Sequence, residues 1–346
     1  MSAPLVSILL PVRDAAAWVR NAVESLLAQT QRSWELIAVD DGSRDASADL
    51  LSAVATSDDR IRVSATSAQH RGIVAALNLG LSEARAPLVA RMDADDCMHR
   101  RRLELQKRAL DDDPDLFAST CRVQAFPSWS LGEGMRRYLD WQNSLLEPED
   151  LARERFIESP LLHPTAMMRT SELRERLGGW RDAGWPEDWD LFLRAFELGM
   201  RFRRVPRCLY RWRLHARQAT RCDVRYDESA FRRARAHYLA RHVLAHAGGR
   251  ETWILGAGPV GKKLGKALAR EGVELGGFAD IDERKIGGHV RDGSKHWPVI
   301  DAGVLEAMRS RVVAIASVGQ RGARDQIRSR LRAWGWSEGE DFLTAA

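Results

Sequence analysis

Residues 89–96 read Val-Ala-Arg-Met-Asp-Ala-Asp-Asp, and three of these eight side chains are carboxylates within four positions. They follow the apolar run Pro87–Ala90, which predicts a β-strand, and open α/β sheets bind ligands at strand ends. Carboxylates packed this closely repel one another unless water solvates them or a divalent cation neutralises them. A second acidic pair, Asp40 and Asp41, ends the apolar run Glu35–Val39. Two acidic strand ends therefore predict a metal–nucleotide site.

The first hundred residues alternate between strand and helix patterns. Apolar runs predict strands, and apolar residues at helical spacing predict helices between them. Such alternation predicts a mostly parallel sheet flanked by helices, an α/β fold. The expected strands are 5–12, 35–39, 61–65 and 88–92, and the expected helices are 16–29, 46–55 and 72–83.

Composition sets the class of protein but not its ligand. The chain has 346 residues, is 45% hydrophobic and 29% charged, and carries a formal charge of +5, which is ordinary for a globular protein. A basic balance permits a phosphorylated ligand, a nucleic acid or an anionic membrane surface and selects none of them. The four cysteines lack disulfide or zinc spacing, so we expect reduced thiols and a cytoplasmic protein. No apolar run approaches the roughly 20 residues that span a bilayer.

The C-terminal half carries further helices and a fresh start of the strand–helix pattern. Helix signals cover 101–110, 145–155, 186–198 and 227–247, and strand signals cover 116–123 and 202–212. After Gly248 and Gly249 a new strand–glycine–helix pattern begins. We therefore expect a first domain at 1–220, a helical linker at 221–249 and a small α/β domain at 250–346.

Several motifs, in a fixed order over about residues 5–215, resemble the family 2 glycosyltransferases, which have the GT-A fold. Each motif alone is weak, but together their order and spacing are specific. They are residues 6–13 (VSILLPVR), 25–30 (SLLAQT), 34–43 (WELIAVDDGS), Arg71-Gly72 with Asn78, 90–96 (ARMDADD), His163-Pro164-Thr165 and Glu187-Asp188.

The resemblance implies a nucleotide-sugar donor, with UDP, GDP or dTDP as the nucleotide, and a divalent cation, Mn²⁺ or Mg²⁺. Asp93 and Asp95 are similar to the family's DxD motif, with Asp95 as the direct metal ligand and Asp93 near the ribose or the metal's water. Asp96 is expected to cap the following helix. His215 is a candidate metal ligand. Asp41 resembles the residue that holds the nucleobase or ribose, and the other candidates for donor binding are Pro11, Arg13 and Arg71.

The same resemblance implies an inverting transfer to an acceptor hydroxyl. Asp188 is similar to the base that takes the acceptor's proton, and Glu187 would orient the site. Trp180 and Trp185, in a Gly- and Trp-rich loop, are candidate stacking platforms for the acceptor, and His163 is a candidate acceptor-site residue. Where many relatives have Pro after the DxD segment, this chain has residues 99–102 (HRRR), for which a solvated helix start is expected.

The 250–346 segment carries Gly256, Gly258 and Gly261 between an expected strand and helix, the spacing of a dinucleotide-binding fingerprint. Asp280 ends the next strand, at the distance of a ribose-binding acid. The segment resembles Rossmann-like accessory domains of sugar-modifying enzymes, and at this length it is roughly half of a dinucleotide-binding fold. A structural, oligomerising or acceptor-positioning role is favoured over nucleotide binding, and NAD(P) is the less favoured occupant.

The leading hypothesis is an inverting, metal-dependent glycosyltransferase that acts on a glycan, lipid-linked or similar acceptor in polysaccharide biosynthesis. Two alternatives remain: an NAD(P)-dependent sugar oxidoreductase that uses the C-terminal fingerprint, and a non-catalytic sugar-binding module. No nucleic-acid partner is expected. An Arg-rich helix near 231–241 leaves open peripheral contact with the inner face of a membrane, and a homo-oligomer is also left open.

Overall fold

The computed structural model describes residues 3–66 and 71–346 and divides them into two compact units. The first unit contains residues up to 152 together with 160–223, and the second contains 153–159 together with 224–346. The predicted linker at 221–249 contains helix α9 (Glu228–His246), which belongs to the second unit. Asp227 caps this helix by accepting a hydrogen bond from the Ala230 amide.

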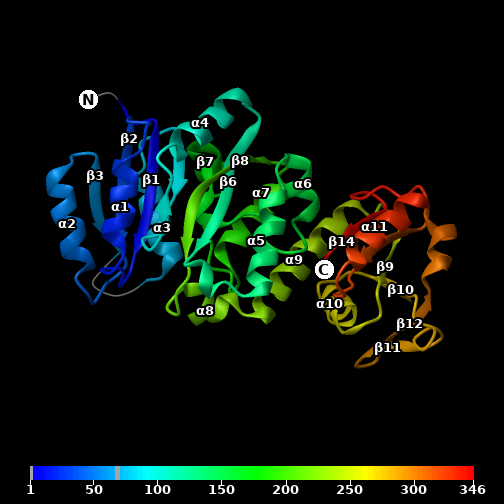
Figure 1. Ribbon diagram of the computed structural model, residues 1–346. Helices are drawn as coiled ribbons and strands as arrows, with labels where there is room; N and C mark the ends of the chain where they lie inside the picture. The colour runs from blue at the N-terminus through cyan, green and yellow to red at the C-terminus, as the bar shows by residue number, and fades with distance from the viewer. Residues whose placement is uncertain (1–2, 67–70) are drawn as a thin grey trace. The chain divides into compact units, whose positions relative to one another are not determined.

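An eight-stranded sheet forms the centre of the first unit (Figure 1). Its strands, in spatial order, are β3 (Ile61–Ala65), β2 (Trp34–Asp40), β1 (Val6–Val12), β4 (Leu88–Arg91), β7 (Met167–Arg169), β6 (Leu116–Phe126), β8 (Arg201–Arg213) and β5 (Cys97–Met98). The first four strands are mutually parallel, and β7 runs antiparallel between β4 and β6. The α/β class with a mostly parallel sheet is therefore confirmed.

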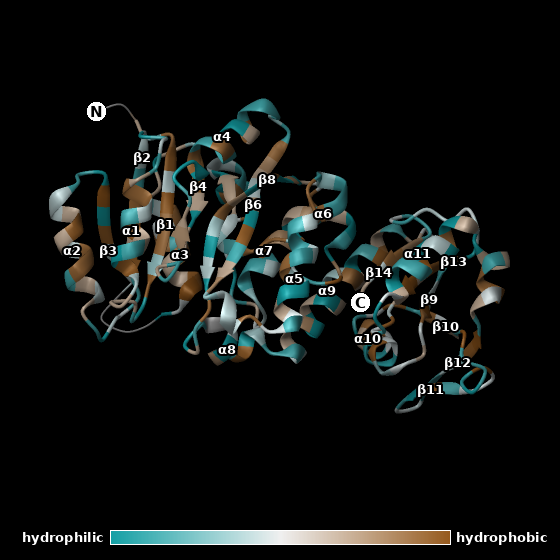
Figure 2. Ribbon diagram, viewed as in Figure 1, coloured by the Kyte–Doolittle hydropathy of each residue, from teal (hydrophilic) through white to brown (hydrophobic). Residues whose placement is uncertain are grey.

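Helices cover both faces of this sheet because the inner strands alternate between two apolar faces. On β1, Ile8 and Leu10 pack in a cluster with helix α1 (Val19–Leu27), whereas Leu9 packs in a second cluster with helix α3 (Ile73–Glu83). A strand buried on both faces reads as a mainly apolar run, and β1 is largely brown in Figure 2. The remaining helices are α2 (Ser47–Ser57), α4 (Arg102–Asp112), α5 (Glu133–Ser144), α6 (Pro148–Glu154), α7 (Glu187–Glu197) and α8 (Ala219–Cys222).

The basic segment after the acidic loop is solvated at His99 and Arg100, as expected, but not at its last residue. Arg102 opens α4 but is fully buried, and its guanidinium donates to the Arg91 carbonyl oxygen and to Gln106. Its guanidinium carbon also lies 4.9 Å from the centre of the Tyr210 ring. Its Nη1 has no partner among the described residues, but the paired nitrogens and the ring contact tie Arg102 into the core, so it is a structural residue here.

The second unit has a six-stranded sheet in the order β11-β12-β10-β9-β13-β14. All neighbours are parallel except the β11–β12 pair, which is antiparallel. The strands are β9 (Glu251–Leu255), β10 (Leu275–Asp280), β11 (His289–Asp292), β12 (Lys295–Asp301), β13 (Val312–Ala316) and β14 (Phe342–Thr344). The helices are α10 (Pro259–Arg270) and α11 (Ala323–Ala333), beside α9. Parallel strands lie on both sides of β9, so the sheet extends in both directions from its first strand. One half of a doubly wound sheet extends in only one direction, so the unit is more than such a half.

Candidate active site

Three neighbouring strands, β2, β1 and β4, bring the predicted donor-site residues to one edge of the first sheet. β1 pairs in parallel with β2 on one side and with β4 on the other. The chain therefore leaves the carboxyl end of β1 at a point where the strand order reverses. Open α/β sheets bind ligands at such switch points. Pro11, Asp41 and Asp93 all lie at or just beyond these strand ends.

The acidic loop after β4 gathers three carboxylates. One oxygen from each of Asp93, Asp95 and Asp96 lies within 4.8 Å of the other two. Burial, and then repulsion from Asp95, raises the pKa of Asp93 despite its ion pair with Arg91. A divalent cation relieves this kind of repulsion, and oxygen ligands are those that Mg²⁺ and Mn²⁺ prefer. The three carboxylates therefore have the chemistry of a site for Mg²⁺ or Mn²⁺.

The three acids have different surroundings. Asp96 is fully buried, and its Oδ1 accepts a 2.6 Å hydrogen bond from the Arg213 amide on β8. Burial, reinforced by the charges of Asp95 and Asp93, raises its pKa well above the usual value. The expectation that Asp96 caps a helix is wrong, because β5 follows it and α4 begins only at Arg102. Asp96 instead ties the loop to the end of β8.

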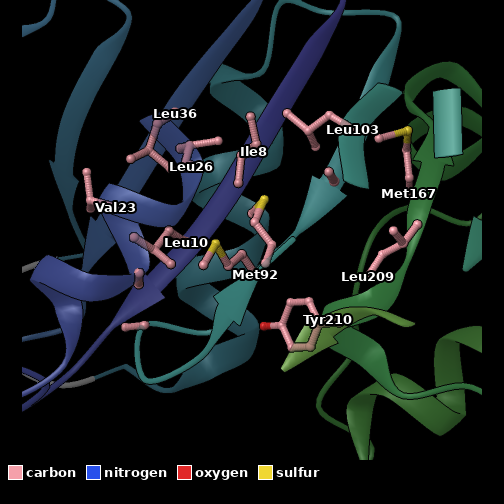
Figure 3. Packing of buried hydrophobic residues seen from close by; sticks show 14 of the residues in the cluster. Ile8, Leu10, Val23, Leu26, Leu36, Met92, Leu103, Met167, Leu209 and Tyr210 are labelled. Carbon is pink, nitrogen blue, oxygen red and sulfur yellow. The ribbon is translucent and has the colours of Figure 1, made fainter. Parts of the chain in front are cut away.

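The end of β8 holds the acidic loop in two further places. The Asp93 amide donates to the Tyr210 hydroxyl at 3.1 Å, and the Arg213 Nε donates to the Asp95 carbonyl oxygen at 2.6 Å. In Figure 3 the Tyr210 ring projects from β8, beside Met92 in the packed core. The loop's position thus depends on a strand more than a hundred residues further along the chain.

His215 lies against the side chain of Asp95, which has more contact with solvent than Asp96. The distance from His215 Nε2 to Asp95 Oδ2 is 2.7 Å. The Arg217 amide donates to His215 Nδ1, so the proton of a neutral ring is on Nε2, where it is donated to Asp95. Trp18 stacks on the imidazole with ring centres 4.2 Å apart. Sequence reasoning missed Trp18, because nothing near it in the chain signals this contact.

Asp41 is buried at the end of β2 and organises the segment in front of α3. Its Oδ1 accepts from the Arg71 amide at 2.9 Å and from the Thr66 hydroxyl at 2.8 Å, and its Oδ2 accepts from the Gly72 amide at 3.0 Å. Gly72 has φ of +91°, a conformation that disfavours other residues. The Arg71 side chain is exposed beside this loop.

The loop after β1 carries the predicted Arg13, whose exposed side chain lies 3.7 Å from Asp14. Asp14 has φ of +47°, unusual outside glycine, and its carboxylate accepts from the Arg44 amide at 2.7 Å. The Asp14 amide in turn donates to the Ser43 hydroxyl at 3.0 Å. Asp14 therefore joins the loops after β1 and β2. The sequence signal for it is weak, because Asp merely tolerates this conformation better than most residues.

Glu187 and Asp188 open helix α7 but differ in exposure. Glu187 is buried, whereas Asp188 keeps partial contact with solvent and accepts a 2.7 Å hydrogen bond from the Trp189 amide. Loss of hydration, and then the adjacent Glu187 charge, raises the pKa of Asp188 to about 7. A carboxylate with this pKa is suited to accept a proton near neutral pH.

His163 lies beneath this acidic pair. Its Nε2 accepts from the Trp180 indole at 2.9 Å, which leaves the proton of a neutral ring on Nδ1, 3.8 Å from Glu187 Oε1. Burial, and then the Arg91 charge, lowers the pKa of His163 well below its usual value, so the ring stays neutral. The buried His163 ring therefore presents its Nδ1 proton on the side of Glu187 that faces the protein interior.

The two tryptophans of the preceding loop differ. Trp180 is 2% exposed, so the expectation that it stacks on an acceptor is wrong; its ring packs in the core and holds His163. Trp185 is half-buried and donates from its indole to Asp190 Oδ1 at 2.9 Å. It remains a candidate platform.

Arg91 joins the two groups of acids. Its buried guanidinium pairs with Asp93, and its charge also acts on Glu187, Asp188 and His163. The acidic loop after β4 and the start of α7 thus belong to one electrostatic site.

Comparison with known proteins agrees with this geometry. The family model for glycosyl transferase family 2 matches residues 7–178. EpsE of Bacillus subtilis, which bears a glycosyltransferase name, is 32% identical over 67% of this chain and 77% of its own length. The chain belongs to glycosyltransferase family 2.

Solved structures extend the likeness of this transferase to its fold. S. aureus TarS, solved with UDP-GlcNAc, has a TM-score of 0.52 and 16% identity, over 69% of this chain and 72% of the TarS chain. The mannosyltransferase PcManGT from Pyrobaculum calidifontis, solved with GDP-Man and Mn²⁺, has a TM-score of 0.52 and 17% identity, over 98% of this chain and 83% of its own. The GT-A fold of the transferase is therefore confirmed.

Because the chain belongs to this family, the glycosyltransferase hypothesis stands in place of the two alternatives, an oxidoreductase and a non-catalytic sugar-binding module. Gly256, Gly258, Gly261 and Asp280 come together in the second unit, around the turn from β9 to α10. Among the described residues of the transferase, no helix has both the length and the hydropathy to span a membrane.

Proposed function

We propose that this transferase moves a sugar from a nucleotide-sugar donor to an acceptor hydroxyl by one inverting displacement that depends on a divalent cation. The observation that carries the proposal is the pair of acidic groups joined by Arg91. One group has the chemistry of a cation site, and the other contains a partly exposed carboxylate whose pKa is about 7. A donor site and a proton acceptor are the two parts that such a displacement needs.

The donor's nucleotide is proposed to bind across the ends of β1, β2 and β4. Arg13 and Arg71 present exposed guanidinium groups, which suit phosphate oxygens. Pro11 and Asp41, at the ends of β1 and β2, are proposed to contact the nucleotide beside them. UDP-GlcNAc in TarS and GDP-Man in PcManGT support a nucleotide-sugar donor as a class and leave UDP, GDP and dTDP open for this chain.

Asp95 and Asp93 are the residues proposed to hold the cation. Asp95 is the better placed, because Asp96 is buried against Arg213 and Asp93 is paired with Arg91. His215 donates to Asp95 and orients it; direct metal ligation by His215 would require its Nε2 proton to leave. When bound, a divalent cation supplies positive charge for the departing diphosphate.

The acceptor side of the reaction is proposed to depend on Asp188. Its carboxylate takes the proton of the acceptor hydroxyl while that oxygen bonds to the anomeric carbon. The bond between the anomeric carbon and the diphosphate oxygen breaks in the same step, so the nucleoside diphosphate leaves with the electron pair. Glu187, supported by neutral His163, keeps Asp188 positioned, and Trp185 is proposed to contact the acceptor, which is a glycan or a lipid-linked sugar.

A thermal-shift screen of nucleotide sugars, with and without Mn²⁺, tests the donor half of the proposal. At least one nucleotide sugar is expected to stabilise the protein more with Mn²⁺ than without it. Asp95→Asn should remove the Mn²⁺-dependent part, whereas Asp111→Asn, on the exposed face of α4, should keep it. Equal stabilisation of wild type and Asp95→Asn by donor with Mn²⁺ would overturn the metal assignment.

A further inference from the structure

The second unit has a cavity at the carboxyl ends of its central strands. β9 lies between β10 and β13 in the sheet. The chain continues from β9 to β10 on one side and later crosses to β13 on the other, so the strand order reverses at β9. A cavity of about 700 Å³ lies here, lined by residues that follow each of these three strands. Among them are Gly258, Asp280, Ile281, Ser317 and Arg321. This place and size are typical of ligand sites in doubly wound sheets.

The three glycines of the turn after β9 are present for different reasons. A Cβ on Gly261 would lie 1.9 Å from the Gly256 carbonyl oxygen, and one on Gly256 would lie 2.8 Å from the Ser317 carbonyl oxygen. The fold therefore requires both of these glycines. Gly258 differs, because its backbone is extended at φ −79° and a Cβ there would meet nothing within 4 Å. Packing within the protein does not require glycine at position 258, and the open space beside this backbone leaves room for a ligand to approach closely.

Gly258 is also the cap of α10, a helix of 12 residues whose first two residues, Pro259 and Val260, line the cavity. The N-terminal end of a helix attracts phosphate oxygens. Arg321 lines the same cavity and has no carboxylate partner within the part of the chain that the structure describes. The region beside Gly258 is therefore suited to a diphosphate.

Ser317 supplies an independent sign of a ligand. Ser317 is 1% exposed and lines the cavity, and its hydroxyl has no hydrogen-bond partner among the described residues. A buried hydroxyl left unpaired costs stability, so native proteins satisfy nearly all such groups. A bound molecule in the cavity would satisfy this one.

Asp280 lies opposite this end of α10, at the end of β10. Its Oδ2 accepts from the Ala257 amide at 2.7 Å and from Lys285 Nζ at 3.1 Å, so it also braces the glycine turn. Its Oδ1 accepts from the Asp282 amide at 3.0 Å, which leaves a lone pair on this oxygen for a hydroxyl. The next side chain, Ile281, is 72% exposed and offers an apolar surface beside that point.

We propose that this cavity is a second nucleotide site, which binds a nucleoside diphosphate whose ribose carries free hydroxyls. The diphosphate lies over Gly258 and the first turn of α10, the ribose is held by Asp280, and the base rests near Ile281. Ser317 donates to the bound molecule. A 2′-phosphate would approach the Asp280 carboxylate, so nucleotides of the NADP type are disfavoured.

Isothermal titration of the full chain tests the site with NADH, NADPH, ADP and UDP as probes. EDTA is present throughout, to suppress metal-dependent binding in the first unit. NADH, ADP or UDP is expected to bind, and NADPH is expected to bind at least about tenfold more weakly than NADH. NADH and ADP together report a preference for adenine, and UDP alone reports a preference for uracil.

Gly258→Val places a side chain where the diphosphate is proposed to lie. Its expected effect is a loss of affinity of more than about tenfold. Gly132→Val is the matched control, because Gly132 also caps a helix with an extended backbone, at φ −69°, and has open space around its Cβ position. Absence of binding by all four probes overturns the proposal, as does binding that Gly258→Val leaves unchanged.

Ser317→Ala separates binding from folding. Removing an unpaired buried hydroxyl should leave the melting temperature of the ligand-free protein unchanged or raised, while affinity for the bound probe falls about three- to tenfold. Unchanged affinity in this variant contradicts the role of Ser317. NADPH binding as tightly as NADH contradicts the role of Asp280.

Discussion

Arg91 shows how a single buried residue ties the reaction centre together. Arg91 is 2% exposed, and its guanidinium pairs with Asp93 in the acidic loop and interacts electrostatically with Glu187 at the start of α7. In the sequence it is one Arg among many, and its place two residues before Asp93 does not indicate this coupling. Its influence on Asp188 arises because β4 and α7 meet in the fold. The sequence therefore predicts the acids but not the residue that couples them.

The raised pKa of Asp188 predicts how the transfer rate depends on pH. The base must be ionised to accept a proton, so the rate should rise with pH to a plateau above about 7 and fall about tenfold per unit below it. Initial rates at saturating donor between about pH 5.5 and 8.5 measure this profile. Glu187→Gln removes the neighbouring negative charge and should move the midpoint downward. A midpoint that is the same in both proteins would rule out this coupling.

Trp18 is expected to act through His215. Trp18→Leu removes the stacked ring, leaves His215 and Asp95 less ordered, and should raise the KM for donor about three- to tenfold in the presence of Mn²⁺. Steady-state kinetics over a donor titration provides the measurement. Trp129→Leu is the control, since Trp129 is 86% exposed. Identical KM values for both variants would show that the stack has no part in donor binding.

At the scale of elements, the sequence predicts the helices and strands that have a periodic apolar pattern. It misses strands that are too short for a pattern and helices that lack an apolar stripe. The expected strand at 61–65 matches β3, and the expected helix at 186–198 becomes α7 at 187–197. Helix α5 was missed because only Leu139 and Gln142 are buried along its 12 residues. Strands β5 and β7 have two and three residues, too few for a pattern. These two strands become recognisable only when β8 and β4 lie beside them.

The loop before α7 depends on a similar long-range contact. Asn78 on α3 exchanges two hydrogen bonds with the Trp180 backbone: its Nδ2 donates at 2.9 Å and its Oδ1 accepts at 3.0 Å. Asn78→Ala leaves both backbone groups unpaired and should lower the free energy of unfolding by about 1–3 kcal/mol. Urea denaturation gives this value. Asn21→Ala, at an exposed position on α1, should change it by less than about 0.5 kcal/mol. Equal effects of the two substitutions would contradict the bracing role.

At the scale of the whole molecule, the chain combines two α/β sheets whose candidate sites lie at equivalent places but differ in how far the sequence predicts them. Both place glycine, acidic and basic residues where the strand order changes, and both have a candidate site there. The motifs of the first sheet identify the family, so its site could be predicted residue by residue. The fingerprint of the second sheet is shared by many functions, and the features that favour a ligand, Gly258 with open space and Ser317 unpaired, exist only in three dimensions.

The two sites are expected to work independently when no second nucleotide is added. Gly258→Val should then transfer sugar at a rate within about twofold of wild type, because none of the residues proposed for the transfer lies in the second unit. The measurement is the release of nucleoside diphosphate from donor and acceptor. Loss of transfer in a variant that keeps its wild-type melting temperature would show that the second unit takes part in the reaction.

The most direct test of the proposed reaction compares donor binding and turnover in Asp188→Asn. The substitution keeps the size of the side chain and removes its capacity to accept the proton. Binding of nucleotide sugar with Mn²⁺ should stay within about twofold of wild type, while turnover falls by about 10²–10⁴. Asp182→Asn, an exposed acid of the same loop, should retain both. Full turnover by Asp188→Asn would contradict the assignment of Asp188 as the base.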